Sequence, residues 1–232
     1  QIIKGDSYVE DLSSSIQKDM SVAAARGRIY DRNGVLLAYN DLSYAVKISD
    51  SGRYSDNATK NATINNSINK TLDIIENHGD TYSNDFPIIY NNGQFSYNVE
   101  GTSLLRFLRD SYGTESIAAL SDEQKATSAE NMFKYLCKTY EVNYDEFGIE
   151  HSLMIVNLRR YMAANSYNRY LTFIIANEVS DETVAAILEN SDGLVGVTVE
   201  EQYIRRYVDS VYCSQILGYT GTVSNSELEE LG

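Results

Sequence analysis

The sequence predicts an α+β fold, with a mixed or antiparallel sheet built from both chain ends and a large helical insertion. Three observations lead to this prediction: hairpin signals in the first segment, a long stretch of helical apolar periodicity, and alternating β-type segments near the end. We therefore predict a discontinuous β-rich core, residues 1–50 and 170–232. Residues 51–169 are predicted to form a mainly helical insertion subdomain.

The composition is that of a folded globular protein with an acidic surface. Apolar residues make up 43% of the 232 residues and charged residues 22%, while the formal net charge is −14. Such a surface repels phosphate backbones, so nucleic acid is excluded as a partner.

The first predicted strands follow a polar lead-in. Residues 7–25 carry apolar positions three or four apart, which favours a helix or an extended segment with one apolar face. A hairpin is predicted over residues 28–38, because Asn33 and Gly34 between apolar runs both tolerate positive φ. Residues 44–48 continue as a strand.

An amphipathic helix is predicted over residues 55–77. Asparagines recur every fourth residue, each followed two positions later by Thr or Ser, as in glycosylation sequons; they are Asn57, Asn61, Asn65 and Asn69. Because this period is helical, we interpret them as a solvated amide-rich face. The apolar stripe beside them is expected to face inward and comprises Ile64, Ile68, Leu72 and Ile75.

The rest of the insertion is predicted to contain a second hairpin and several helices. The hairpin spans residues 88–97, and residues 103–165 are mainly helical. A capping box at residues 121–124 is expected to open the helix that carries Phe133. Phe107, Phe133 and Tyr140 either lie in the insertion's own core or form an exposed docking patch.

β-type patterning returns after the insertion. Residues 170–176 form a predicted strand, and a short helix begins at Ser180. Val195, Val197 and Val199 alternate with other residues, as in a half-buried strand.

The sequence offers no parts for common catalytic or cofactor chemistry. Cys137 and Cys213 form no CxxC motif and have no histidine pair nearby, so we predict no metal site and no cofactor. We expect both cysteines to lie in the core, and whether they form a disulfide with each other stays open. Ser15 and Ser67 each begin an S-x-x-K match, but about one such match is expected by chance, and no K-T-G follows. We predict no catalytic residue.

Two parts of the chain resemble class B penicillin-binding proteins. The run RGRIYDRNGVLLA at residues 26–38 is similar to the first signature of that family, and residues 196–199, 205–207 and 216–221 are similar to the second. Val208 and Ser210 depart from the usual proline and glycine. The structural signature residues are Arg26, Gly27, Asp31, Arg32, Asn33, Gly34, Arg205, Tyr207 and Gly218.

The resemblance implies a non-catalytic extracytoplasmic pedestal. Its implied partners are the protein's own transpeptidase domain, a membrane glycosyltransferase and other divisome or elongasome proteins, with a weak homodimer possible. It also implies a bacterial protein on the outer face of the cytoplasmic membrane, with an N-terminal transmembrane anchor preceding this chain. A free-standing surface module that binds a glycan or a peptide is the alternative.

The charged signature residues are expected to form a network. A partly buried arginine needs a carboxylate or carbonyls in good geometry. We therefore expect these four residues to join the first hairpin to the last strand, rather than to stand as four exposed charges: Arg26, Asp31, Arg32 and Arg205.

Overall fold

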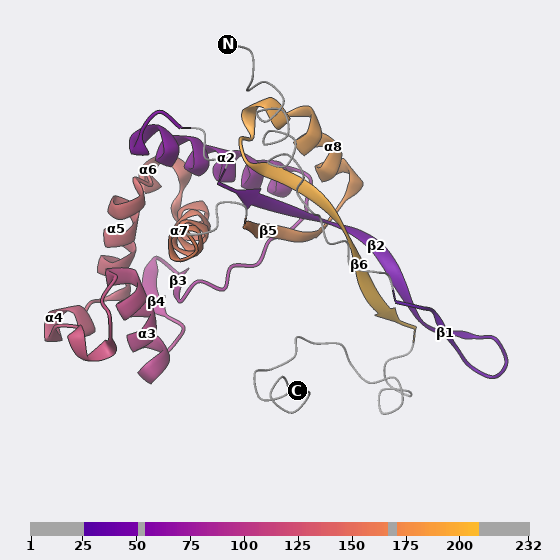
Figure 1. The fold of residues 1–232 in the computed structure, drawn as a ribbon, viewed down its shortest axis with the longest axis horizontal. Helices are drawn as coiled ribbons and strands as arrows, with labels where there is room; N and C mark the ends of the chain where they lie inside the picture. Colours follow the sequence, from indigo (N-terminus) through magenta and orange to yellow (C-terminus); the bar gives the residue numbers. More distant parts are fainter. Residues whose placement is uncertain (1–25, 51–53, 167–170, 209–232) are drawn as a thin grey trace, which may run out of the picture. The chain divides into compact units, whose positions relative to one another are not determined.

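The computed structural model describes residues 26–50, 54–166 and 171–208 (Figure 1). The predicted lead-in, Ser15, Cys213 and Gly218 lie outside these residues. The chain forms two compact units, one from residues 1–41 and 203–232 and the other from residues 42–202. No helix within the described ranges is both long enough and apolar enough to cross a membrane.

The predicted N-terminal hairpin is confirmed. Strand β1 (Ile29–Tyr30) pairs antiparallel with the start of β2 (Leu36–Ser49), and the register shifts between the two residues of β1. Strand β6 (Val197–Tyr207) also pairs with β2. The first hairpin and the last described strand therefore share one sheet, as predicted.

The same sheet continues with β5 (Thr172–Val179), which runs antiparallel to β2. Its strand order is β1-β2-β5, with β6 paired to β2. The second predicted hairpin is confirmed as a separate two-stranded sheet, β3 (Ile88–Asn91) with β4 (Gln94–Tyr97). Together with the helices, these antiparallel sheets confirm the α+β class.

Most of the remaining described chain is helical, as the periodicity predicts. The elements are α2 (Asn57–Asn77), α3 (Gly101–Tyr112), the 3₁₀ turn η1 (Ile117–Ala119), α4 (Asp122–Lys125), α5 (Ala129–Tyr140), α6 (Tyr144–Phe147), α7 (Ile149–Ala164), α8 (Asp181–Glu189) and the 3₁₀ turn η2 (Ser191–Gly193). Helix α7 is central: it contacts α2, α5, α6, β3 and β5, and residues 151–159 are all buried.

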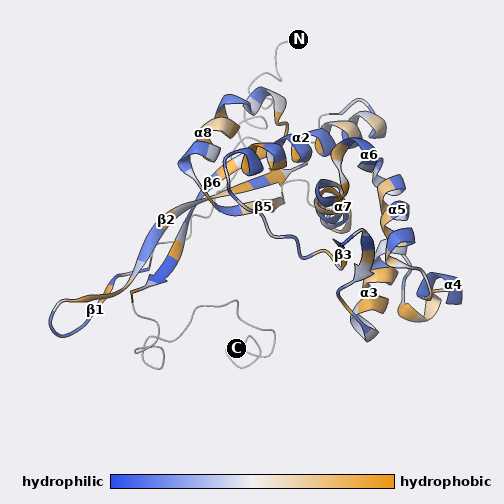
Figure 2. Ribbon diagram, turned by 180° about the vertical axis from the view of Figure 1, so that it is seen from behind, coloured by the Kyte–Doolittle hydropathy of each residue, from blue (hydrophilic) through white to orange (hydrophobic). Residues whose placement is uncertain are grey.

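The core of the larger unit, residues 42–202, includes the apolar stripe of α2. Ile64, Ile68, Leu72 and Ile75 of α2 are fully buried, which confirms the predicted inward stripe. The alternation of hydrophilic and hydrophobic residues along α2 is visible in Figure 2.

The capping box opens a different helix from the one predicted. Ser121 and Gln124 cap each other as expected, but the helix that they begin, α4, ends at Lys125. Helix α5, which carries Phe133, has its own N-cap, Ser128, whose side chain accepts a hydrogen bond from the Asn131 N–H. Local capping therefore occurs twice in this segment.

Candidate functional site

The signature hairpin is shaped by Asp31. Its Oδ1 accepts hydrogen bonds from the backbone N–H of Asn33 (2.8 Å) and Val35 (2.7 Å). The hydrogen bond from Val35 is the main cause that lowers the pKa of the Asp31 carboxyl, helped by those from Asn33. In this turn only Gly34 has a positive φ (+82°). Asn33 was expected to tolerate a positive φ as well, but it does not adopt one.

Arg205 joins β6 to the segment that precedes β1. Its Nη1 donates to the Gly27 carbonyl at 2.7 Å and to Asn40 Oδ1 at 3.1 Å. Asn40 Nδ2 in turn donates to the Arg26 carbonyl at 2.5 Å. The signature is thus connected through backbone carbonyls.

This network differs from the predicted one. Asp31 bonds to its own turn rather than to an arginine, and Arg26 takes part through its carbonyl. The side chains of Arg26 and Arg32 are exposed, whereas Arg205 and Tyr207 are half-buried. Arg205 needs no carboxylate here, because a backbone carbonyl and the Asn40 amide oxygen accept hydrogen bonds from its guanidinium.

In the larger unit, the second signature contributes Gly196, which approaches β2 closely. Its φ is +83°, and a Cβ on it would lie 2.3 Å from the Ser49 carbonyl oxygen. The Gly196 carbonyl accepts a hydrogen bond from the Ser49 N–H at 2.9 Å. Both the backbone conformation and the close approach require glycine here.

The prediction of a solvated amide face on α2 holds for Asn57, which is exposed, and is wrong for the other three asparagines. Asn65 is buried, and its Nδ2 donates to the carbonyls of Tyr140 (2.9 Å) and Glu141 (3.2 Å). Asn61 accepts a hydrogen bond from Arg159 of α7, and Asn69 Oδ1 lies 2.8 Å from His151 Nδ1. The amides satisfy polar groups of neighbouring elements, which burial demands.

His151 belongs to a polar cluster between α7 and α2. Its Nε2 lies 3.1 Å from Glu76 Oε1, which also accepts a hydrogen bond from the Tyr82 hydroxyl at 2.8 Å. Burial acts to raise the pKa of Glu76, but the hydrogen bonds from Tyr82 and His151 outweigh it and hold that pKa below its usual value. Sequence reasoning missed this cluster because its members are far apart in the chain.

Asp80 fixes the start of α8. Its Oδ2 accepts hydrogen bonds from the Ser180 N–H (2.8 Å), the Ser180 hydroxyl (2.8 Å) and the Thr183 hydroxyl (2.6 Å). Burial acts to raise the pKa of Asp80, but the hydrogen bonds from Thr183 and Ser180 outweigh it, so the pKa lies below its ordinary value. The carboxylate also lies at a helix N-terminus, where the helix dipole favours negative charge.

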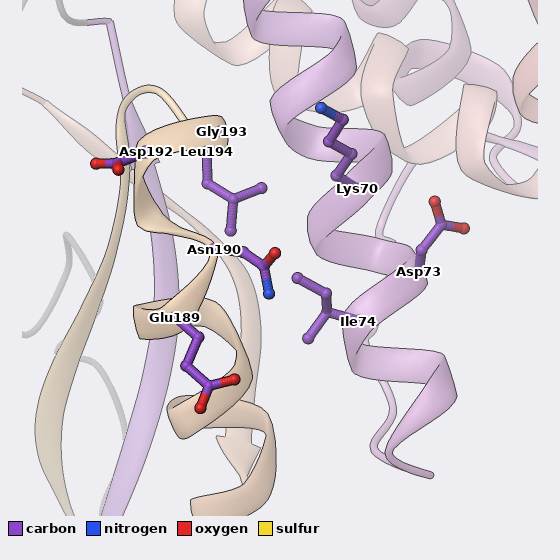
Figure 3. Close-up of a pocket in the computed structure, with 8 residues that line it drawn as sticks. All are labelled: Lys70, Asp73, Ile74, Glu189, Asn190, Asp192, Gly193 and Leu194. Carbon is purple, nitrogen blue, oxygen red and sulfur yellow. The ribbon is translucent and has the colours of Figure 1, made fainter.

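A pocket of about 410 Å³ lies between α2 and the end of α8 (Figure 3). Ile74 of α2 and Leu194 contribute apolar walls, and Lys70 extends from α2 near Gly193. The other lining residues are polar or acidic: Asp73, Glu189, Asn190 and Asp192. The described residues that line this pocket include no Ser, Thr, Cys or His.

The two phenylalanines proposed for docking are core residues. Phe107 is 4% exposed and Phe133 is fully buried, and Phe133 stacks on Phe95 with ring centroids 4.9 Å apart. Tyr140 is half-buried beneath Arg159. The docking alternative is therefore wrong for Phe107 and Phe133.

Two side chains that the sequence raised as possible reactive groups, Ser67 and Cys137, are both buried. Ser67 is buried inside α2, where a substrate cannot reach its hydroxyl. Cys137 is buried, and burial raises the pKa of its thiol to about 12. Across the described ranges, no group of three His, Cys, Asp or Glu side chains could hold a metal ion.

Sequence comparison gives the family directly. The profile of the penicillin-binding protein dimerisation domain matches residues 21–232. The chain belongs to this family. No curated protein matches the chain.

Two solved structures show some similarity to this dimerisation domain. Penicillin-binding protein 2B from Streptococcus pneumoniae strain 5204 is 17% identical, with a TM-score of 0.43, and the match covers 90% of this chain and 30% of that one. The same protein from strain R6 is 19% identical, with a TM-score of 0.39, and the match covers 86% and 28%. The chain thus spans less than a third of the length of these proteins.

Proposed function

We propose that this dimerisation domain is the non-catalytic extracytoplasmic pedestal of a class B penicillin-binding protein. It holds a transpeptidase domain at the height of the peptidoglycan and offers surfaces to a membrane glycosyltransferase and other division or elongation proteins. The parent protein is a bacterial transpeptidase held to the cytoplasmic membrane by an N-terminal anchor.

The family match over residues 21–232 carries this proposal. Apolar side chains exposed on the smaller unit support it. Tyr30 is 51% exposed, Val35 56% and Tyr203 52%. Tyr30 and Val35 lie in the β1–β2 hairpin, and Tyr203 lies on β6, which pairs with β2. Large exposed apolar groups in this small unit favour a role as a contact surface for another domain or protein.

A deletion in the parent protein tests the proposal. Replacing residues 28–38 with a short flexible linker should leave labelling of the transpeptidase by fluorescent penicillin unchanged. The same deletion should abolish complementation of a strain that lacks the parent gene. Full complementation by the deleted protein would contradict a positioning role, and covalent labelling of this chain alone would contradict its non-catalytic nature.

A further inference from the structure

Three arginine side chains of the first hairpin segment are exposed: Arg26, Arg28 and Arg32. Among the described residues, none of their guanidinium groups makes a hydrogen bond or an ion pair. Asp31, the one acidic residue between positions 26 and 35, uses its carboxylate to accept N–H groups of its own turn. Three arginines and one aspartate give residues 26–35 a formal net charge of +2, in a chain whose net charge is −14.

Apolar side chains lie between these arginines. Tyr30 and Val35 are each more than half exposed, and Ile29 is 38% exposed. Arginine and tyrosine are enriched at protein interfaces and among the residues that dominate binding energy. A hairpin that only had to remain soluble would carry polar residues at these positions. The composition is therefore that of a binding surface.

The backbone of this segment offers a strand edge. Strand β1 is the end of the sheet order β1-β2-β5, and β6 pairs with β2, so no described strand pairs with the outer edge of β1. The residues just before β1 are held in place, because Arg205 donates to the Gly27 carbonyl and Asn40 donates to the Arg26 carbonyl. An unpaired and fixed strand edge can accept an extended peptide through backbone hydrogen bonds.

Charge and hydrogen bonding together select the occupant. Edge-to-edge pairing with a second copy would bring these arginines close to those of the other copy, and like charges across strands are unfavourable. A bilayer surface supplies no backbone groups to pair with β1. Carboxylates, in contrast, bind guanidinium groups through paired hydrogen bonds.

We propose that the outer edge of β1 binds an extended acidic segment of a partner protein. Its carboxylates contact the three exposed arginines, and its apolar side chains contact Tyr30 and Val35. Side chains alternate along a strand, so a segment that alternates acidic and apolar residues fits this edge. This inference rests on the proposed role of the smaller unit as a contact surface and adds the chemistry of the partner.

An NMR titration of the full chain tests the site. The probe is an acetylated and amidated hexapeptide of alternating glutamate and valine, and the comparisons are the lysine–valine hexapeptide and vesicles of phosphatidylglycerol. The glutamate peptide should produce saturable amide shifts centred on residues 28–35. Binding should weaken as salt is added, because exposed charges are screened.

Paired substitutions separate the site from the net charge. Arg28→Gln combined with Arg32→Gln should weaken binding of the glutamate peptide by about tenfold or more, which corresponds to at least 1.4 kcal/mol. Arg106→Gln combined with Lys138→Gln makes the same change in net charge at exposed residues of the larger unit, and should leave binding unchanged. Tyr30→Ser should weaken binding without any change in charge.

Arg28→Lys combined with Arg32→Lys guards against a variant that fails to fold. It keeps the charge and should bind more weakly than the parent chain but more tightly than the glutamine pair, because an ammonium lacks the planar donors of guanidinium. Equal weakening by the two glutamine pairs would overturn the site. Stronger binding of the lysine peptide would overturn the acidic assignment, and the same amide shifts with phosphatidylglycerol vesicles would overturn the peptide assignment.

Failure of this inference is distinct from failure of the proposed function. If the glutamate peptide does not bind while deletion of residues 28–38 still abolishes complementation, the acidic partner is wrong and the positioning role stands. If the peptide binds but the deleted protein complements fully, the β1 edge is a binding site and the positioning role is wrong.

Discussion

In the signature hairpin, polar side chains bond mainly to the backbone at the surface, whereas in the helical unit they are buried and join one element to another. Asp31 shapes its own turn, and Arg205 reaches the Gly27 carbonyl. In contrast, Asn65 and Asp80 each connect segments about 75 or more residues apart. Among the described residues of the smaller unit, Ala38 is the one buried apolar residue. We infer that the residues of the hairpin motif determine a backbone shape and an exposed surface. The buried residues of the helical unit contribute most of the free energy of unfolding.

Core truncation should separate the two regions most strongly. Phe133→Ala removes a fully buried ring and should lower the free energy of unfolding by about 3–5 kcal/mol. The matched change Tyr30→Ala in the hairpin removes a half-exposed ring and should cost under about 1 kcal/mol. Chemical denaturation followed by circular dichroism measures both. Equal losses would show that the hairpin is as tightly packed as the helices.

Asp80→Asn should give the next largest effect. The amide can accept fewer hydrogen bonds from Ser180 and Thr183 and carries no charge at the start of α8, so we expect a loss of about 2–3 kcal/mol at pH 7. Asp41→Asn, which alters an exposed pair with Arg206 of the smaller unit, should cost under about 0.5 kcal/mol.

The effect of Asp80 should depend on pH. Because its folded pKa is lowered, its contribution is present above the unfolded value of about 3.9 and is lost as pH falls through the folded value. The difference between the parent chain and Asp80→Asn should therefore shrink as pH falls below about 4. A difference that grows on acidification would contradict the ionised role of Asp80.

Arg205→Ala tests how the hairpin is joined to β6. Its half-buried guanidinium bonds to one carbonyl and one side-chain amide, so we expect a loss of about 1–2 kcal/mol, less than a buried ion pair would give. Hydrogen exchange at the Val208 N–H, which donates to the Leu37 carbonyl at 3.0 Å, should accelerate. Arg32→Ala, which removes an exposed side chain, should change neither stability nor exchange measurably.

The smallest expected effect comes from the turn itself. Gly34→Ala places a Cβ at φ +82° with no steric neighbour, so the cost should be about 1 kcal/mol from backbone strain alone. Gly27→Ala, at a position where φ is not positive and nothing lies within 4 Å, serves as control and should be near neutral. Thermal unfolding of both variants makes the comparison. An equally large loss of stability in Gly27→Ala would mean that side-chain contacts, and not the positive φ of Gly34, determine the stability of this hairpin.

The sequence alone determined the α+β class, both hairpins, the inward stripe of α2 and the helix that starts after Ser180, because each depends on local turn chemistry or on periodicity. Only the tertiary structure decided where the amide face of α2 lies. A four-residue period shows that Asn61, Asn65 and Asn69 share a face, but the period is the same whether that face meets water or another element. Their partners, Arg159, the Tyr140 carbonyl and His151, lie 75 to 98 residues away, and neither spacing nor composition encodes such a pairing.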